Sequence, residues 1–113
     1  MPSLIDQKTF AELRRMVGED FIQELLETYF ESSPQLIAEM QAALASGDAE
    51  AFQRAAHSMK SNSASFGALD LAAQARALEA LGRDRNLNGA ALQLDTLAAS
   101  YHQVEFELRE LAR

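Results

Sequence analysis

The stretch NGAALQLDTLAASYHQVEFELRELA, residues 88–112, has the most regular pattern in the chain. Its apolar residues recur in alternating steps of four and three, a spacing that places them on one face of an α-helix. These residues are Ala90, Leu94, Leu97, Tyr101, Val104, Leu108 and Leu111. Such a stripe either packs into a core shared with other helices or forms a surface for a partner helix. A shared core is the favoured interpretation.

The remaining sequence divides into similar segments. Ala and Leu are strong helix formers and occur 21 and 16 times, whereas Val, Ile and Thr together occur eight times. The five glycines fall between periodic segments, where helices end. Asp6, Asp48 and Asp70 are suitable N-cap residues because a carboxylate accepts hydrogen bonds from the free N–H groups of a first turn. The expected helices span about residues 6–17, 19–46, 48–66, 70–81 and 88–112.

These segments predict an all-α fold, an antiparallel up-down four-helix bundle with a short additional N-terminal helix, in a single domain over residues 1–113. The second segment has its own apolar stripe, formed by Ile22, Leu25, Leu26, Tyr29, Leu36, Met40 and Leu44. Pro34 interrupts this segment, and proline removes one helical hydrogen bond. We therefore expect either a kink or a restart at residues 32–34, where Ser32 and Gln35 would form a capping box.

Composition excludes several classes of function. The chain has no Cys, which excludes a disulfide scaffold, a thiol nucleophile and a Cys-based metal site. No apolar run approaches the roughly 20 residues that span a membrane, and the N-terminus lacks a signal pattern, so we expect a cytoplasmic protein without membrane contact. The net charge of −7 argues against nucleic-acid binding. All of it comes from residues 1–50, because residues 51–113 have seven acidic and seven basic residues.

The segment 48–66 differs from the other predicted helices. On a helical wheel at about 100° per residue, its core stripe is Phe52, Ala55, Ala56, Met59, Ser63 and Phe66. His57 lies about 140° from Phe52 and points to solvent, with Lys60 one turn further along the same edge. An exposed His beside a Lys is more often incidental than functional. Two details favour a function here: residues 51–69 have two basic and no acidic residues, and small residues cluster on the His57 face.

The stretch AAHSMKSNSASFGALDLAAQARALE, residues 55–79, resembles the signature of the histidine-containing phosphotransfer (HPt) domain of two-component phosphorelays. The shared features are a His, a Lys three residues later, small residues, a Gly ten residues after the His and a Leu-Glu pair on the next helix. In this chain they are His57, Lys60, Ser61, Ser63, Gly67 and Leu78-Glu79. The chain departs from many members at Ser61, where they have Gly. Its length and helix order also fit the family.

The resemblance implies that His57 is the phosphorylation site, accepting a phosphoryl group from a receiver-domain aspartyl phosphate and passing it to another receiver. Lys60 would compensate the phosphoryl charge. Gly67 would let the receiver approach closely, or serve only as a helix C-cap. Glu79 would orient the imidazole or pair with Lys60, or be a plain surface acid. Ser61 and Ala64 would belong to the docking surface, as would Gln53, one turn before His57.

Other chemistries find no support in the sequence. His102 lacks the Glu-x-x-His pairs of a carboxylate-bridged metal site, so no metal ligands are expected. No Gly-rich phosphate loop is present, so we expect no ATP binding, no autokinase activity and no cofactor, with Mg²⁺ only in the partner receiver. Receiver domains, including one of a hybrid sensor kinase, are the expected partners of a monomer. The alternative is a helical adaptor that binds receivers without being phosphorylated. An acid–base enzyme would need a second catalytic group that the sequence lacks.

Overall fold

The computed structural model describes residues 3–113, which fold into five α-helices and no strand. The helices are α1 (Gln7–Val17), α2 (Glu19–Ser46), α3 (Ala49–Ser65), α4 (Leu69–Arg83) and α5 (Ala90–Leu111). The expected all-α fold is therefore confirmed. No helix in this range is long and apolar enough to cross a membrane.

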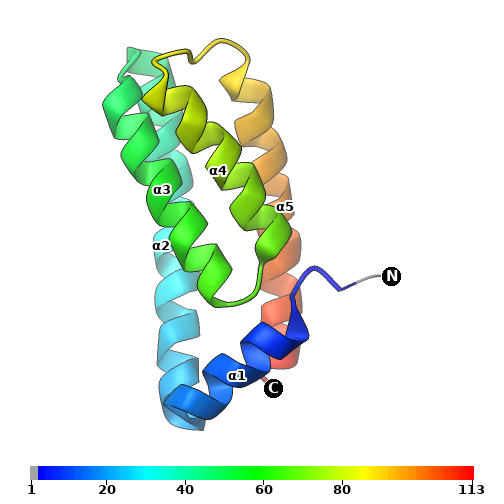
Figure 1. Ribbon diagram of the computed structural model, residues 1–113. Coiled ribbons are helices and arrows are strands. Elements are labelled where there is room, and N and C mark those ends of the chain that lie inside the picture. Colours follow the sequence, from blue (N-terminus) through cyan, green and yellow to red (C-terminus); the bar gives the residue numbers. More distant parts are fainter. Residues whose placement is uncertain (1–2) are drawn as a thin grey trace.

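The four longer helices lie lengthwise beside one another, and α1 lies across one end (Figure 1). α3 packs on both α2 and α4, and α5 also packs on α2 and α4, whereas α3 and α5 are not direct neighbours. α1 contacts α2 and α3. α3 and α4 run in opposite directions and make the most extensive helix pair, and this pair holds the site described below.

The core follows the predicted stripes except in α2, where the predicted Leu25, Leu36 and Leu44 are only half-buried. On α5 every residue of the predicted stripe is buried except Leu111, which is half-buried. On α2 the buried face passes through Tyr29, Ser33, Ile37 and Met40. The sequence pattern instead predicts Leu36 in this stripe. Ser33 is polar, so the apolar pattern does not reveal that the buried face continues from Tyr29 in a step of four residues.

Pro34 lies inside an uninterrupted helix, so the predicted restart at residues 32–34 is wrong. The capping box with Gln35 does not form. The Ser32 hydroxyl instead donates to the carbonyl of Tyr29 at 3.5 Å, a bond back into the preceding turn. A helix of 28 residues packed on three other helices retains enough other hydrogen bonds to tolerate the one that proline removes.

Of the three predicted N-cap residues, Asp6 and Asp48 occupy the N-cap position of their helices, and Asp70 does not. The Asp48 side chain accepts from the backbone N–H of Ala51 at 3.0 Å, as expected. Asp6 precedes α1, but its carboxylate accepts from the Thr9 hydroxyl instead of a backbone N–H. Asp70 lies in the first turn of α4, whose N-cap is Ala68, so its prediction as an N-cap is wrong. α4 begins earlier because the chain turns immediately after α3. In the first turn of α4, the Asp70 carboxylate still interacts favourably with the positive end of the helix dipole.

Candidate functional site

α3 presents His57 to solvent as the wheel predicted. Phe52, Ala56 and Met59 are fully buried and fix the rotation of the helix about its axis. The side chain of His57 is 58% exposed, and that of Lys60, one turn along, is 30% exposed. The core packing of α3 therefore determines that the imidazole faces outward.

Glu79 on α4 connects the two functional candidates of α3. One carboxylate oxygen lies 2.6 Å from Nδ1 of His57, and the other lies 2.7 Å from Nζ of Lys60. The Glu79 side chain is only 13% exposed, so it lies between the helices while His57 projects further out. Both suggested contacts of Glu79 are therefore present together, and its interpretation as a plain surface acid is wrong.

The charge on Glu79 sets the tautomer of His57. The hydrogen bond from Lys60, and after it that from His57, lower the pKa of the Glu79 carboxyl below its ordinary value despite partial burial. An ionised carboxylate only accepts hydrogen bonds. Nδ1 of neutral His57 must therefore carry the proton, and the lone pair lies on Nε2, the ring nitrogen directed away from Glu79.

Gly82 sets the spacing between α3 and α4. A Cβ on Gly82 would lie 2.9 Å from the backbone N and Cα of Gln53, so only glycine allows this approach. As the sequence predicts, Gly82 lies at a helix end: it is the penultimate residue of α4, where it is buried. A glycine three residues after Glu79, within a stretch of helix formers, was the available signal for a close helix contact.

The other predicted site residues lie along the His57 face. Gln53 is half-buried one turn before His57, and Ala64 is half-buried two turns after it. Ser61 is exposed, and its carbonyl accepts a hydrogen bond from the Ser65 hydroxyl at 3.0 Å. Ser61 and Ala64 leave a surface of short side chains between Lys60 and the end of α3.

Gly67 does not belong to that surface. It is buried, has a φ of 86°, and its carbonyl accepts from the N–H of Asp6 at 2.8 Å. A Cβ at this position would lie 2.7 Å from the carbonyl oxygen of Asp6. Its prediction as a docking residue is therefore wrong: glycine is required by the turn after α3 and by the segment that leads into α1.

Comparison with known proteins agrees with this geometry. The family described as "Hpt domain" matches residues 24–109, which include the whole of α3 and α4. The chain belongs to the Hpt domain family. A search of curated proteins finds no match.

A solved structure is similar over nearly the whole chain. It is the crystal structure of histidine-containing phosphotransfer protein B (HptB) from Pseudomonas aeruginosa PAO1. The two chains share 28% sequence identity with a TM-score of 0.92, and the match covers 99% of this chain and 96% of that chain. Members of the Hpt family are phosphotransfer carriers, not kinases, and they interact with receiver domains of phosphorelays.

The inner side of α3 in this Hpt domain is held by a polar contact within the core. The hydroxyls of Tyr29 and Ser63 lie 2.8 Å apart, and burial raises the pKa of Tyr29 to about 12. Tyr29 also packs on Phe66 and Tyr101, with ring centroids 4.9 Å and 5.8 Å away. These contacts join α3 to α2, and α2 in turn to α5, within the core.

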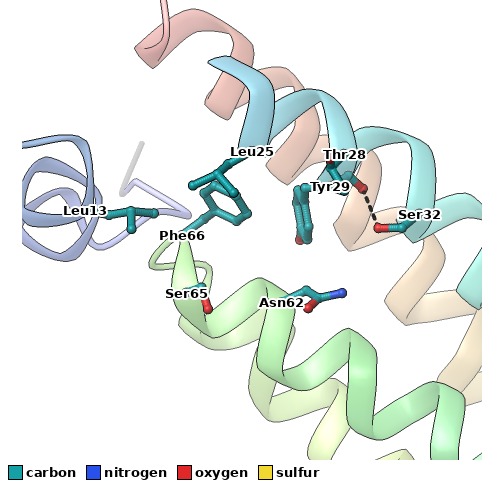
Figure 2. A pocket seen from close by; sticks show the side chains of 8 residues that line it. All are labelled: Leu13, Leu25, Thr28, Tyr29, Ser32, Asn62, Ser65 and Phe66. Atoms are coloured by element: carbon teal, nitrogen blue, oxygen red, sulfur yellow. Dashed lines mark hydrogen bonds between the residues drawn. The ribbon is translucent and has the colours of Figure 1, made fainter. Parts of the chain in front are cut away.

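A small cavity of about 280 Å³ opens beside this contact, between α1, α2 and the end of α3. Figure 2 shows Leu13, Leu25 and Phe66 grouped at one end, with Asn62 and Ser32 at the other. Asn62 lies about 140° around α3 from His57. The cavity is therefore separate from the His57–Glu79–Lys60 site.

Within residues 3–113, no group of three or more His, Asp and Glu side chains is placed to hold a metal ion. His102 lies exposed on α5, as expected for a surface residue. Of the two histidines, His57 is the one whose ring nitrogen contacts a carboxylate within residues 3–113.

Proposed function

We propose that His57 is the phosphorylated residue of this phosphorelay intermediate, receiving the phosphoryl group from a receiver-domain aspartyl phosphate and passing it to another receiver. The observation that carries the proposal is the 2.6 Å contact between Nδ1 of an exposed His57 and a Glu79 oxygen. A nucleophilic imidazole needs one nitrogen with a free lone pair and a fixed ring orientation. The contact with Glu79 supports both requirements.

The chemical step follows from this tautomer. The lone pair of Nε2 attacks phosphorus in line with the P–O bond of the aspartyl phosphate. The Nε2–P bond forms, the P–O bond breaks, and its electron pair returns to the aspartate carboxylate of the receiver. The proton on Nδ1 stays in place, so the phosphorylated ring becomes cationic and its hydrogen bond to Glu79 strengthens. Reversal of these steps delivers the phosphoryl group to a second receiver.

Lys60 supplies the positive charge for the phosphoryl oxygens. Its Nζ lies 2.7 Å from Glu79 in the unphosphorylated protein and is partly exposed. A flexible ammonium group with three N–H donors can keep its hydrogen bond to Glu79 and donate another to a phosphoryl oxygen, because one carboxylate oxygen uses only one donor. Phosphoryl transfer relies on such charge compensation and positioning.

Ser61, Ala64 and Gln53 form the immediate docking surface. Their exposed or half-buried positions on the His57 face, with side chains no longer than Gln, leave room for the loops around a receiver aspartate. Gly67 is not part of this surface, because it packs against Asp6.

The remaining properties follow from the same role. The arrangement supports a single domain built as an antiparallel four-helix bundle, α2 to α5, with α1 across its end. We propose a monomer that acts in the cytoplasm, has no autokinase activity and needs no cofactor. The Mg²⁺ of aspartyl-phosphate chemistry would be bound by the partner receiver. One donor or acceptor receiver would belong to a hybrid sensor kinase.

The experiment measures transfer from phosphorylated receivers of the source organism to the wild type and to His57→Gln. We expect acid-labile, alkali-stable phosphate on the wild type only. His102→Gln is the matched control, because it removes the other histidine from an exposed helix face. Receiver binding without label on the wild type would establish the adaptor alternative instead. Label that persists in His57→Gln would refute the assignment of His57.

A further inference from the structure

The surface around His57 is basic in an otherwise acidic protein. Residues 49–83, which contain α3 and α4, have four basic and three acidic residues, whereas the rest of the chain has six basic and fourteen acidic. α2, the other neighbour of α3, has six acidic residues and no basic one. The charge separation follows the helices and is not spread evenly over the surface.

Arg76 and Arg83 are the basic residues of α4, and both lie on the same side of the helix as Glu79. They are three residues before it and four after it, which places each about one turn from Glu79. Both arginines are exposed. Arg76 has no ion pair among residues 3–113, and Arg83 approaches only the exposed Asp84, at 3.9 Å. Neither guanidinium is held by a strong internal contact.

The alignment of α3 with α4 puts these arginines beside the site. His57 meets Glu79, and Gln53 meets Gly82, so the two helices run antiparallel in a fixed register. Arg83 therefore lies next to the level of Gln53, one turn on one side of His57. By the same count Arg76 lies near the level of Lys60, on the other side. Figure 1 shows α3 and α4 as neighbouring helices that run in opposite directions.

The carboxylate at the centre of this arrangement is directed at α3 and is largely shielded from solvent. Glu79 is 13% exposed, and its two oxygens contact His57 and Lys60. The arginines project outward while the acid points inward. An approaching protein therefore meets an imidazole between cations.

We propose that Arg76 and Arg83 form, together with Lys60, a docking surface that attracts the acidic phosphorylation face of a receiver domain to His57. The inference rests on the proposed function and names the residues that recruit its partner. A phosphoryl group carries nearly two negative charges at neutral pH, and the carboxylates that bind Mg²⁺ beside an aspartyl phosphate add more. Opposite charge on two docking surfaces raises the association rate by factors of about 10 to 1,000.

The test compares two phosphoryl donors on each variant. One donor is a phosphorylated receiver domain, chosen from those of the source organism as the one that transfers fastest to the wild type. The other is phosphoramidate, a small molecule with no docking surface, and it reports the reactivity of His57. The variant is Arg76→Glu/Arg83→Glu. The matched control is Arg15→Glu/Arg113→Glu, which changes net charge equally at exposed positions outside α3 and α4.

We expect the receiver rate, divided by the phosphoramidate rate, to fall about ten-fold or more in the Arg76/Arg83 variant and less than about two-fold in the control. The fall should shrink between about 0.1 M and 1 M salt, where the screening length drops from about 10 Å to 3 Å. Arg76→Gln/Arg83→Gln should show an intermediate loss and provides a second variant if charge reversal unfolds the protein.

Equal losses in the variant and the control would overturn the proposal, since net charge alone would then explain the effect. No loss in either would overturn it as well. A wild type that takes label from neither donor would refute the proposed function itself, and the phosphoramidate measurement separates that failure from a failure of docking.

Discussion

The carboxylate of Glu79 on α4 accepts a hydrogen bond from Nδ1 of His57 on α3, at 2.6 Å. The two residues are 22 positions apart and meet because α3 and α4 form an antiparallel hairpin with a short turn. This contact determines which ring nitrogen is free. It also makes the reactivity of a surface histidine depend on the packing of two helices.

Replacement Glu79→Ala should slow phosphorylation of His57 by about ten-fold or more, because the carboxylate fixes the orientation and the tautomer of the attacking ring. The His57 ring would then populate both tautomers. It would also rotate more freely, which lowers the fraction of molecules in which Nε2 is oriented for attack. ¹⁵N chemical shifts of the imidazole should show the Nδ1–H tautomer in the wild type and a mixture in the variant. Asp84→Ala, an exposed acid just past α4, is the control. An unchanged tautomer in Glu79→Ala would contradict the role of Glu79.

The pH dependence of stability should also report on Glu79. Its pKa in the folded protein is lowered, chiefly by the hydrogen bond from Lys60. A lowered folded pKa stabilises the fold at pH values above the unfolded pKa of about 4.3, and this contribution is lost as pH falls through the folded pKa. The unfolding free energy of the wild type should therefore fall more steeply below about pH 4.3 than that of Glu79→Gln. Parallel curves from urea titrations at pH 6 to 3 would contradict the lowered pKa.

Lys60→Ala should separate charge compensation from folding. The side chain is partly exposed and lies off the core stripe, so the unfolding free energy should change by less than about 1 kcal/mol. Transfer should slow about ten-fold, because a charge-assisted hydrogen bond contributes about 1.5–3 kcal/mol. Lys60→Arg should recover part of the rate. Rapid-quench transfer kinetics and thermal unfolding on the same preparations give both readouts.

Much of this site is predictable from the sequence, because the rotation of α3 follows from its apolar period. Phe52, Ala56 and Met59 determine where His57 points, and the count of residues through the hairpin brings Glu79 to the height of His57. Which contacts Glu79 makes depends on its side-chain torsions, and these produce no periodic pattern in the sequence. The sequence therefore leaves three interpretations of Glu79 open, and only the positions of its oxygens distinguish them.

The glycines show the other limit of sequence reasoning. A glycine in the sequence indicates that a Cβ is absent at that position, but it does not indicate which atoms fill the space that a Cβ would occupy. Gly67 matched a docking interpretation by its spacing from His57, yet the N-terminal segment fills that space through Asp6. The buried Ser33 shows a similar gap, since a hydroxyl in a core position has no hydrophobic signal.

Gly67→Ala should therefore destabilise the protein without a specific effect on docking. Its φ of 86° strains any residue with a Cβ, and the added atom meets the Asp6 carbonyl at 2.7 Å. We expect a loss of about 2 kcal/mol or more in unfolding free energy. Gly47→Ala is the control, because its φ of 72° is similar but its Cβ would meet nothing within 4 Å. A larger loss at Gly67 measures the packing of the N-terminal segment, and equal losses would contradict that contact.

Gly82→Ala tests whether the spacing of α3 and α4 sets the geometry of the site. Alanine is favoured over glycine inside a helix by about 1 kcal/mol, so propensity alone predicts stabilisation. The added Cβ would lie 2.9 Å from backbone atoms of Gln53, which cannot move without shifting α3. Overpacking of this kind costs about 1–3 kcal/mol, so we expect net destabilisation. Separation of the helices should also weaken the His57–Glu79 hydrogen bond one turn away and slow transfer. An alanine variant that is more stable than the wild type, with an unchanged His57 tautomer, would show that this contact does not hold the site together.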